Sequence, residues 1–360
     1  MATCLIALGS NLGDRCVVLT EAIRQLAAHP DIHLLARSDW FRTQPVGGPA
    51  GQGEFVNAAV RVETSLAPEA LWEVLHHLEQ HLGRQRRERW AARRVDLDLL
   101  LYGDRALQTP QLTIPHPRMA FRRFVLEPAA QVAPEMRHPL WGWTIQQLRE
   151  HLDTAANYIA LTGPAATGKT GVARSVSETR GIRLIADRPV GPASPSEISE
   201  PALLRRRADL LSFDTWPAHH SGAISDFWIG QSLAYARLQG ALEASPPAGG
   251  GGPQWPPPLT PEASPDLAHE WLRLRSQVVS PKLIVLLQLP EESRRDEPPQ
   301  PAVHRDHVHR DHAALLVRHQ LGAELREILL HGQHGPVLVL NAEQPETVLA
   351  EVTAAWDAMR

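Results

Sequence analysis

The residues best suited to chemistry in this sequence lie between Arg84 and Asp98. Six arginines occur within 11 residues, and Asp96 and Asp98 follow them directly. Because side chains alternate along a strand, a strand over residues 95–102 places both aspartates on one face, about 7 Å apart. Neighbouring carboxylates resist joint ionisation unless a cation lies between them, and hard oxygen ligands suit Mg²⁺. The pair therefore predicts a magnesium site.

The arginines next to this pair predict a substrate that carries several phosphates. A guanidinium group binds phosphate oxygens in a bidentate manner, and Mg²⁺ commonly bridges them. The alternative is a basic turn exposed to solvent, which is the usual fate of a charge run. The aspartate pair that follows the run favours the site.

Length and composition limit the classes of protein to which the chain can belong. A length of 360 residues predicts two domains, and 43% hydrophobic with 21% charged residues is typical of globular proteins. A net charge of −4 gives no general attraction to nucleic acid or to an anionic membrane. Cys4 and Cys16 indicate no disulfide framework, and no apolar stretch is long enough to span a bilayer. We expect a cytoplasmic protein.

The first half alternates strand and helix patterns, which is typical of an α+β domain. Apolar residues predict buried strands over residues 4–8, 55–62 and 95–102. Apolar stripes with a helical period predict helices over residues 18–26 and 68–82, the second beginning at Pro68.

This half resembles the 6-hydroxymethyl-7,8-dihydropterin pyrophosphokinases, from residue 1 to about 152. The matching segments are Ala7-Leu-Gly-Ser-Asn-Leu12, Phe41-Arg-Thr43, Phe55-Val-Asn57-Ala-Ala59, Leu78-Glu79, Gly83-Arg84, Glu88-Arg-Trp90, Arg93, Val95-Asp96-Leu-Asp98-Leu-Leu, Thr113-Ile-Pro-His116 and Arg122-Arg-Phe124. The resemblance implies a ferredoxin-like α+β sandwich. It also implies transfer of pyrophosphate from ATP to the pterin, with release of AMP, for folate biosynthesis.

The resemblance assigns a role to each matching residue. Asp96 and Asp98 are expected to hold two Mg²⁺ ions, and Arg84 and Arg93 to stabilise the transferred phosphoryl group. The pterin is expected to bind Thr43, Val46, Phe55, Asn57, Trp90 and Phe124. The ATP site is expected to include Glu79, Arg86, Arg89, Leu99, Thr113, His116 and Arg122.

Some of these residues also have simpler interpretations, and others depart from the family. Asn57 also suits a satisfied edge amide, and His116 suits a loop cap between prolines. Trp90, in a basic loop, is interpreted as part of a mobile lid rather than of the core. Phe55 replaces a common tyrosine, while Gln111 and Pro117 replace an arginine and an aromatic residue that are common in the family. The last two bear on ATP affinity and leave the metal site intact.

The second half contains a complete P-loop, Gly163-Pro-Ala-Ala-Thr-Gly168-Lys169-Thr170. A strand pattern at residues 158–162 precedes it and a helical pattern follows it, which is the context that this motif requires. Gly163 and Gly168 permit the turn around the phosphates, Lys169 reaches the β- and γ-phosphates, and Thr170 binds Mg²⁺. Lys169 is one of only two lysines in the chain, the other being Lys282.

Further strand patterns at residues 182–186, 283–289 and 337–340 predict an α/β domain with a parallel P-loop kinase-like sheet over residues 156–360. Through its P-loop, Ser225-Asp226-Phe227 and residues 281–287, this half resembles the deoxynucleoside kinases. It departs from them in two places. Asp187 stands where a glutamate base is usual, and the expected arginine-rich lid is shortened around Arg294 and Arg295 and interrupted by prolines.

Two other segments of the second half have unusual compositions, one rich in proline and glycine and the other in histidine. Residues 245–260, rich in proline and glycine, are expected to form a flexible low-complexity excursion. His304, His307 and His312 share a helical period, but any charged amphipathic helix has the same pattern, so no metal is assigned there.

The sequence thus predicts a transferase in which a pterin pyrophosphokinase (1–152) is fused to a P-loop kinase-like domain (156–360) that accepts a (deoxy)nucleoside. One alternative is a second half that only binds nucleotide or a partner in a regulatory role. Another is a nucleic-acid-binding protein that uses residues 84–94, which the aspartates and the negative net charge disfavour. We expect neither nucleic acid nor membrane as a partner.

Overall fold

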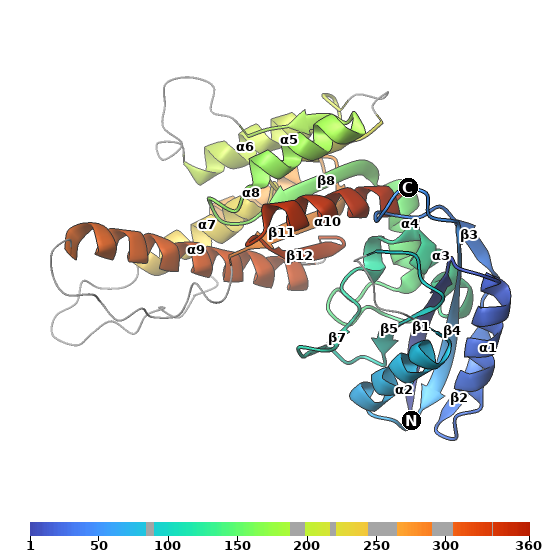
Figure 1. Cartoon of the computed structure of the whole chain (residues 1–360). Coiled ribbons are helices and arrows are strands. Elements are labelled where there is room, and N and C mark those ends of the chain that lie inside the picture. The colour runs from blue at the N-terminus through green and yellow to red at the C-terminus, as the bar shows by residue number, and fades with distance from the viewer. Residues whose placement is uncertain (84–89, 188–198, 217–220, 244–264, 290–304, 333) are drawn as a thin grey trace, which may run out of the picture. The chain divides into compact units, whose positions relative to one another are not determined.

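The structure is a computed structural model, and it describes residues 1–83, 90–187, 199–216, 221–243, 265–289, 305–332 and 334–360. The chain divides into two compact units (Figure 1), one formed by Met1–Thr154 with Thr353–Arg360 and the other by Ala155–Val352. Among the described residues, no helix is long and apolar enough to cross a membrane. The domain boundaries predicted from sequence stay a prediction, because the last eight residues group with the first unit.

The first unit is built on an antiparallel sheet. Its strands are β1 (Ala2–Ser10), β2 (Ile32–Arg37), β4 (Phe55–Thr64) and β5 (Asp96–Tyr102), in the order β2-β4-β1-β5, and β3 (Phe41–Thr43) pairs with β4. Strand β1 is central because residues 4–8 are apolar and buried on both of its faces. On its two sides, Gly9 is opposite Asn57 of β4 and Asp96 of β5, so two polar residues flank a glycine at one end of the sheet.

Helices cover both faces of this sheet. Helices α1 (Arg15–Ala27) and α2 (Pro68–His81) bury Leu19 and Leu75 against Ile6 and Val60 in one apolar cluster. The opposite face, with Leu5 and Ala59, is also buried, and α3 contacts β1, β3 and β4 there. The remaining elements are β6 (Leu107–Gln108), β7 (Thr113–Ile114), the 3₁₀ helix η1 (Met119–Phe121), α3 (Arg123–Val132) and α4 (Ile145–Thr154).

The second unit has a parallel sheet, which confirms that part of the prediction. Its strands are β8 (Ala156–Thr162), β9 (Arg183–Ile185), β10 (Ala223–Ser225), β11 (Pro281–Gln288) and β12 (Val337–Asn341), in the order β12-β11-β8-β10-β9. All described pairs are parallel. Parallel strands have their carboxyl ends at one edge, so the segments after β8, β9 and β10 converge there.

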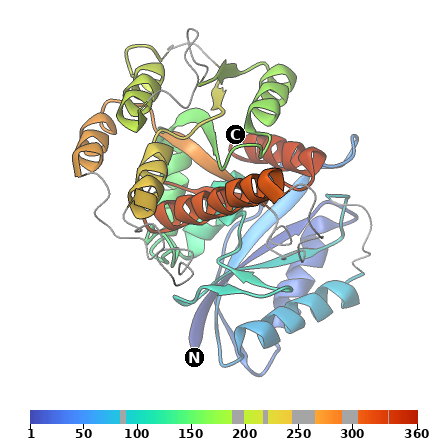
Figure 2. The ribbon, with the colours of Figure 1, turned by 90° about the vertical axis from the view of Figure 1, so that its left-hand side faces the viewer.

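The described helices after β8 are α5 (Lys169–Arg180), α6 (Glu200–Leu211), α7 (Gln231–Glu243), α8 (Pro265–Leu274), α9 (Arg305–His331) and α10 (Pro345–Ala358). Helix α5 packs on β8, β9 and β10, α6 and α8 pack on each other and on α7, and α10 continues into the residues that group with the first unit. The long helix α9 packs against β11 and against α7 (Figure 2). The low-complexity segment, the shortened lid and His304 lie outside the described residues, as do the side chains of His307 and His312.

Candidate active site

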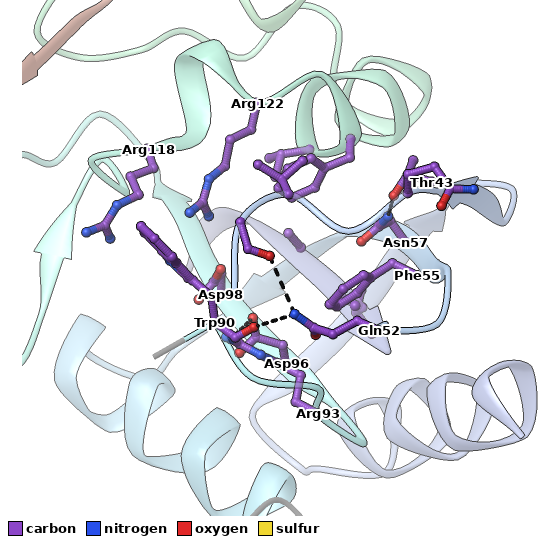
Figure 3. Close-up of a pocket in the computed structure, with 18 of the residues that line it drawn as sticks. Thr43, Gln52, Phe55, Asn57, Trp90, Arg93, Asp96, Asp98, Arg118 and Arg122 are labelled. Carbon is purple, nitrogen blue, oxygen red and sulfur yellow. Dashed lines mark hydrogen bonds and ion pairs between the residues drawn. The ribbon is translucent and has the colours of Figure 1, made fainter. Parts of the chain in front are cut away.

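A cavity of about 470 Å³ opens at the end of the first sheet where Asn57 of β4 and Asp96 of β5 flank Gly9 of β1. Figure 3 shows its charged and polar side chains converging from β5, from the β3–β4 region and from the segment before α3. The residues that line it are Ala7, Leu8, Gly9, Thr43, Gln44, Val46, Gly47, Gln52, Phe55, Asn57, Trp90, Ala91, Ala92, Arg93, Asp96, Asp98, His116, Arg118, Arg122, Phe124 and Val125.

Strand β5 presents Asp96 and Asp98 to the cavity, as its period of two predicts. Leu97 and Leu99 alternate with them and belong to the apolar cluster under the sheet. The neighbouring positions on β1 are Gly9, opposite Asp96, and Ala7, opposite Asp98. Small residues are needed there, since a Cβ on Gly9 would lie 3.2 Å from Asn57 Oδ1. Strand pairing thus leaves open space above both carboxylates.

The two carboxylates have different neighbours. Arg93 donates from Nη1 to Asp96 Oδ2 over 2.7 Å, and both side chains are about one-fifth exposed. His116 Nε2 lies 3.8 Å from Asp98 Oδ2. Mg²⁺ is typically held by one or two carboxylates together with substrate phosphates. Asp96 and Asp98 both line the cavity and fit that donor set.

His116 is neutral in this environment. Its burial, followed by the charges of Arg122 and Arg118, lowers its pKa to about 3. The Arg118 backbone N–H donates to His116 Nδ1 over 3.2 Å, so the ring proton resides on Nε2, which faces Asp98. The 3.8 Å contact is therefore not an ion pair, and His116 is able to donate a hydrogen bond to a carboxylate or a phosphate.

The opposite end of the cavity combines an amide with aromatic rings. Asn57 donates from Nδ2 to Thr43 Oγ1 over 2.8 Å, which fixes its orientation. Phe55 and Phe124 also line this end, and the Arg122 guanidinium lies 5.5 Å from the Phe124 ring centre. Flat rings next to a fixed amide suit a planar heterocycle with a polar edge.

Three segments are tied together at the mouth of the cavity by Asn11 and Gln52. Asn11 Oδ1 accepts from the Arg93 backbone N–H over 2.8 Å, and Asn11 Nδ2 donates to Gln52 Oε1 over 3.2 Å. Gln52 Nε2 in turn donates to the Trp90 carbonyl over 3.0 Å. Gly48, at φ +77°, packs so closely on that carbonyl that a Cβ would clash with it. These contacts hold Trp90 over the cavity.

The structure brings together most of the predicted site residues, and three lie elsewhere. Glu79 is buried and accepts the Leu97 backbone N–H over 2.7 Å, Leu99 is in the core, and Thr113 is on β7 outside the cavity lining. Arg84, Arg86 and Arg89 lie outside the described residues. Gln52 and Arg118 line the cavity although sequence reasoning gave them no role. Arg118 lies two residues after His116, the end of a matched segment, and this proximity was the available signal.

The P-loop of the second unit follows β8 and leads into α5. Gly163 and Gly168 have φ of +141° and +79°, conformations that favour glycine. Lys169 Nζ donates to the carbonyls of Gly163 and Pro164 over 2.8 and 2.7 Å. Burial lowers the Lys169 pKa to about 8, while Asp226 opposes the shift.

Polar side chains after β9 and β10 complete this edge of the parallel sheet. Thr170 Oγ1 donates to Asp226 Oδ2 over 2.7 Å, and Asp226 Oδ1 accepts the Asp187 backbone N–H over 2.9 Å. Arg207 of α6 is almost fully buried and donates from Nε to Asp187 Oδ2 over 2.8 Å and from Nη1 to Ser232 Oγ over 2.8 Å. The residue expected as a base is thus paired with a guanidinium.

Comparison with known proteins identifies the first unit. Residues 5–134 match the family model of 7,8-dihydro-6-hydroxymethylpterin-pyrophosphokinase (HPPK). A 2-amino-4-hydroxy-6-hydroxymethyldihydropteridine pyrophosphokinase of Synechocystis is 42% identical over 152 residues, which cover 42% of this chain and 77% of the relative. The enzyme of the same name from Methylorubrum extorquens is 39% identical over 153 residues, covering 42% of this chain and 95% of the relative.

Among solved structures, a deoxyadenosine kinase from M. mycoides with bound dATP aligns over 54% of this chain and 96% of its own, at 11% identity and a TM-score of 0.33. That score carries no argument about the second unit. The sequence matches define an ATP-dependent diphosphotransferase of folate biosynthesis. The chain belongs to the 6-hydroxymethyl-7,8-dihydropterin pyrophosphokinase family.

Proposed function

We propose that ATP and 6-hydroxymethyl-7,8-dihydropterin meet in the cavity of the first unit, where the pterin hydroxymethyl oxygen attacks the β-phosphorus. The new bond joins this oxygen to phosphorus, the bond between the β-phosphorus and the α,β-bridging oxygen breaks, the hydroxyl proton is lost and AMP leaves. The observation that carries the proposal is that the aspartate pair and the Asn57–Thr43 pair line one cavity.

The pterin is proposed to lie between Phe55 and Phe124, with its polar edge on Asn57. Stacking on aromatic rings positions a flat heterocycle at low entropic cost. The Asn57 amide, fixed by Thr43, offers its Oδ1 to ring N–H or amino groups. Val46 and Trp90 are proposed to close the pocket around the ring.

Asp96 and Asp98 are proposed to hold two Mg²⁺ ions, which neutralise the phosphate charge when they are bound. Arg93 and Arg84 are proposed to stabilise the phosphoryl group in transfer. In the structure Arg93 is bonded to Asp96, so its guanidinium lies at the carboxylates before ATP arrives. Such transfer depends on alignment and charge neutralisation far more than on covalent chemistry.

Several finer assignments belong to this proposal. A ferredoxin-like sandwich is supported by the β-α-β-β-α-β order and by the sheet order β2-β4-β1-β5. The nucleotide is proposed to contact His116 and Arg122, which line the cavity, and Arg86 and Arg89. The contacts proposed for Glu79, Leu99 and Thr113 are indirect, through β5 and β7. A cytoplasmic location is also proposed.

An assay that separates AMP from ADP tests this function. The full chain with ATP, Mg²⁺ and the pterin is expected to release AMP and pterin diphosphate in equal amounts. ADP release that depends on the pterin, or AMP release that does not depend on it, would contradict the proposal. Chelation of Mg²⁺ with EDTA is expected to abolish turnover, and excess Mg²⁺ to restore it.

For the second unit we propose binding of a nucleoside triphosphate and phosphorylation of a (deoxy)nucleoside. The observation that favours binding is the cluster of Lys169, Thr170 and Asp226 at the carboxyl edge of the parallel sheet. Thr170 is proposed to bind Mg²⁺ beside Asp226. Isothermal titration of ATP into the chain is expected to reveal a second site that a Lys169 substitution removes.

The alternative for this unit is a nucleotide-binding module without turnover. Its specific support is the Arg207–Asp187 pair, since the Asp187 carboxylate already accepts a hydrogen bond from a guanidinium that is almost fully buried. ADP release that depends on an added deoxynucleoside decides between the two. Its absence with nucleotide bound would favour the regulatory module.

A further inference from the structure

Arg118 stands out among the cavity residues because it has no role in the site described above. It lines the cavity beside His116, and its backbone N–H is fixed by the bond to His116 Nδ1. Figure 3 shows Arg118 and Arg122 side by side, with both guanidinium groups directed toward the region of Asp98 and Trp90. Both arginines line the same cavity as His116.

The two arginines differ in their distance from the end of the cavity that suits a planar ring. Arg122 lies between Arg118 and Thr43 in Figure 3, and its guanidinium is 5.5 Å from the centre of the Phe124 ring. In Figure 3 Arg118 is farther from Thr43 and Asn57 than Arg122 is, beyond Asp98. The cavity therefore runs from the Thr43 end, past Arg122 and the aspartates, to Arg118.

The order of these residues along the cavity can be compared with the geometry of in-line displacement at phosphorus. The attacking and leaving oxygens lie on opposite sides of the phosphorus under attack. With the pterin hydroxyl at the Asn57 end and the β-phosphorus near the aspartates, the leaving AMP must lie on the far side. Arg118 occupies that side, and a guanidinium binds phosphate oxygens in bidentate fashion.

We propose that Arg118 binds the α-phosphate of ATP and holds it as AMP departs. The inference rests on the proposed function, because it takes the direction of transfer from it. Arg118 is thereby assigned to nucleotide binding and not to pterin binding. Its role differs from that of Arg93, whose guanidinium is bonded to Asp96.

The variant Arg118→Gln, made in the full chain, tests whether Arg118 binds the α-phosphate. Titrations with the non-hydrolysable α,β-methylene analogue of ATP and with AMP are expected to show about 10- to 100-fold weaker binding of both, the loss of a charge-assisted hydrogen bond. The Lys169→Met background removes the second unit's contribution to the titration. The KM for the pterin at saturating ATP is expected to be unchanged. Arg118→Lys is expected to recover part of the affinity, because it keeps the charge but not the bidentate geometry.

Arg105→Gln is the matched control, since Arg105 is exposed, lies 5.7 Å over the Tyr102 ring and is outside the cavity lining. Equal binding of both ligands by Arg118→Gln and wild type would overturn the inference, as would a raised pterin KM. Weaker binding of the ATP analogue with unchanged AMP binding would also overturn it, by moving Arg118 to the β- or γ-phosphate. If the wild type releases no AMP, the proposed function fails, whatever the binding comparison shows.

Discussion

The two proposed phosphate sites lie on different parts of their sheets. In the first unit, the carboxylates stand on the face of an antiparallel strand, and Asn11, Gln52 and Trp90 from separate segments are joined by hydrogen bonds beside the cavity. In the second, the polar residues follow the carboxyl ends of parallel strands, and the P-loop backbone is proposed to form the phosphate cradle.

This difference predicts where each site tolerates change. A strand-face site depends on individual side chains, because its backbone bonds are already used in the sheet. A P-loop site depends on backbone conformation and on one lysine, because its N–H groups contact the phosphates. Single substitutions in one chain can therefore affect one kind of site and leave the other unchanged.

The largest effect is expected for Asp96→Asn in the first unit. Loss of one carboxylate from the metal pair is expected to lower AMP production about 10³-fold or more, because charge stabilisation at the reacting phosphate is the main catalytic contribution. Asp104→Asn is the control, since Asp104 is exposed just beyond β5. AMP release by Asp96→Asn near the wild-type rate would exclude Asp96 as a metal ligand.

Lys169→Met is expected to affect only the second unit. Loss of a charge-assisted contact to phosphate should weaken nucleotide binding there about 10- to 100-fold, with AMP production by the first unit unchanged. Arg174→Gln removes an exposed cation from the same helix and is expected to leave both unchanged. Titration calorimetry measures the binding. A parallel loss of AMP production would show that the two sites are coupled.

The features predicted best from the sequence are those formed by residues close together in the chain. The face of β5 that carries Asp96 and Asp98 follows from a period of two, and the P-loop is one continuous motif between a strand and a helix. That same period places Leu99 on the buried face, and Leu99 is in the core. The ATP contact that the family resemblance implies for Leu99 therefore stays a prediction.

Contacts between distant segments were not predictable. Asn11 and Gln52 meet across 41 positions, and Gln52 and Trp90 across 38. Arg207 reaches Asp187 from a helix 20 residues away, and nothing in either segment specifies the partner. Such pairs depend on how strands are ordered in the sheet, which hydrophobic periodicity does not determine.

A smaller effect is expected at the pterin end of the cavity. Asn57→Ala should raise the KM for the pterin about tenfold, since it removes a fixed amide from the polar edge of the ring. Thr43→Val should raise it less, because Asn57 stays in place but loses its 2.8 Å partner. Steady-state kinetics at saturating ATP measures both. If Thr43→Val were the more damaging change, the threonine would contact the pterin directly.

The smallest effect is expected for Gln52, which contacts loops rather than reacting groups. Gln52→Glu keeps an acceptor for Asn11 Nδ2 but loses the donor to the Trp90 carbonyl, while Gln52→Ala loses both. One neutral hydrogen bond corresponds to about a 2- to 10-fold change, so the AMP-forming kcat should fall in the order wild type, Gln52→Glu, Gln52→Ala. The fluorescence of Trp90 in each protein, obtained by subtracting the spectrum of the same protein with Trp90→Phe, should report the same order of solvent exposure. Equal kcat for all three proteins would mean that the mouth of the first site, like the P-loop of the second, is held by its backbone alone. The difference between the two units would then be confined to the aspartate pair.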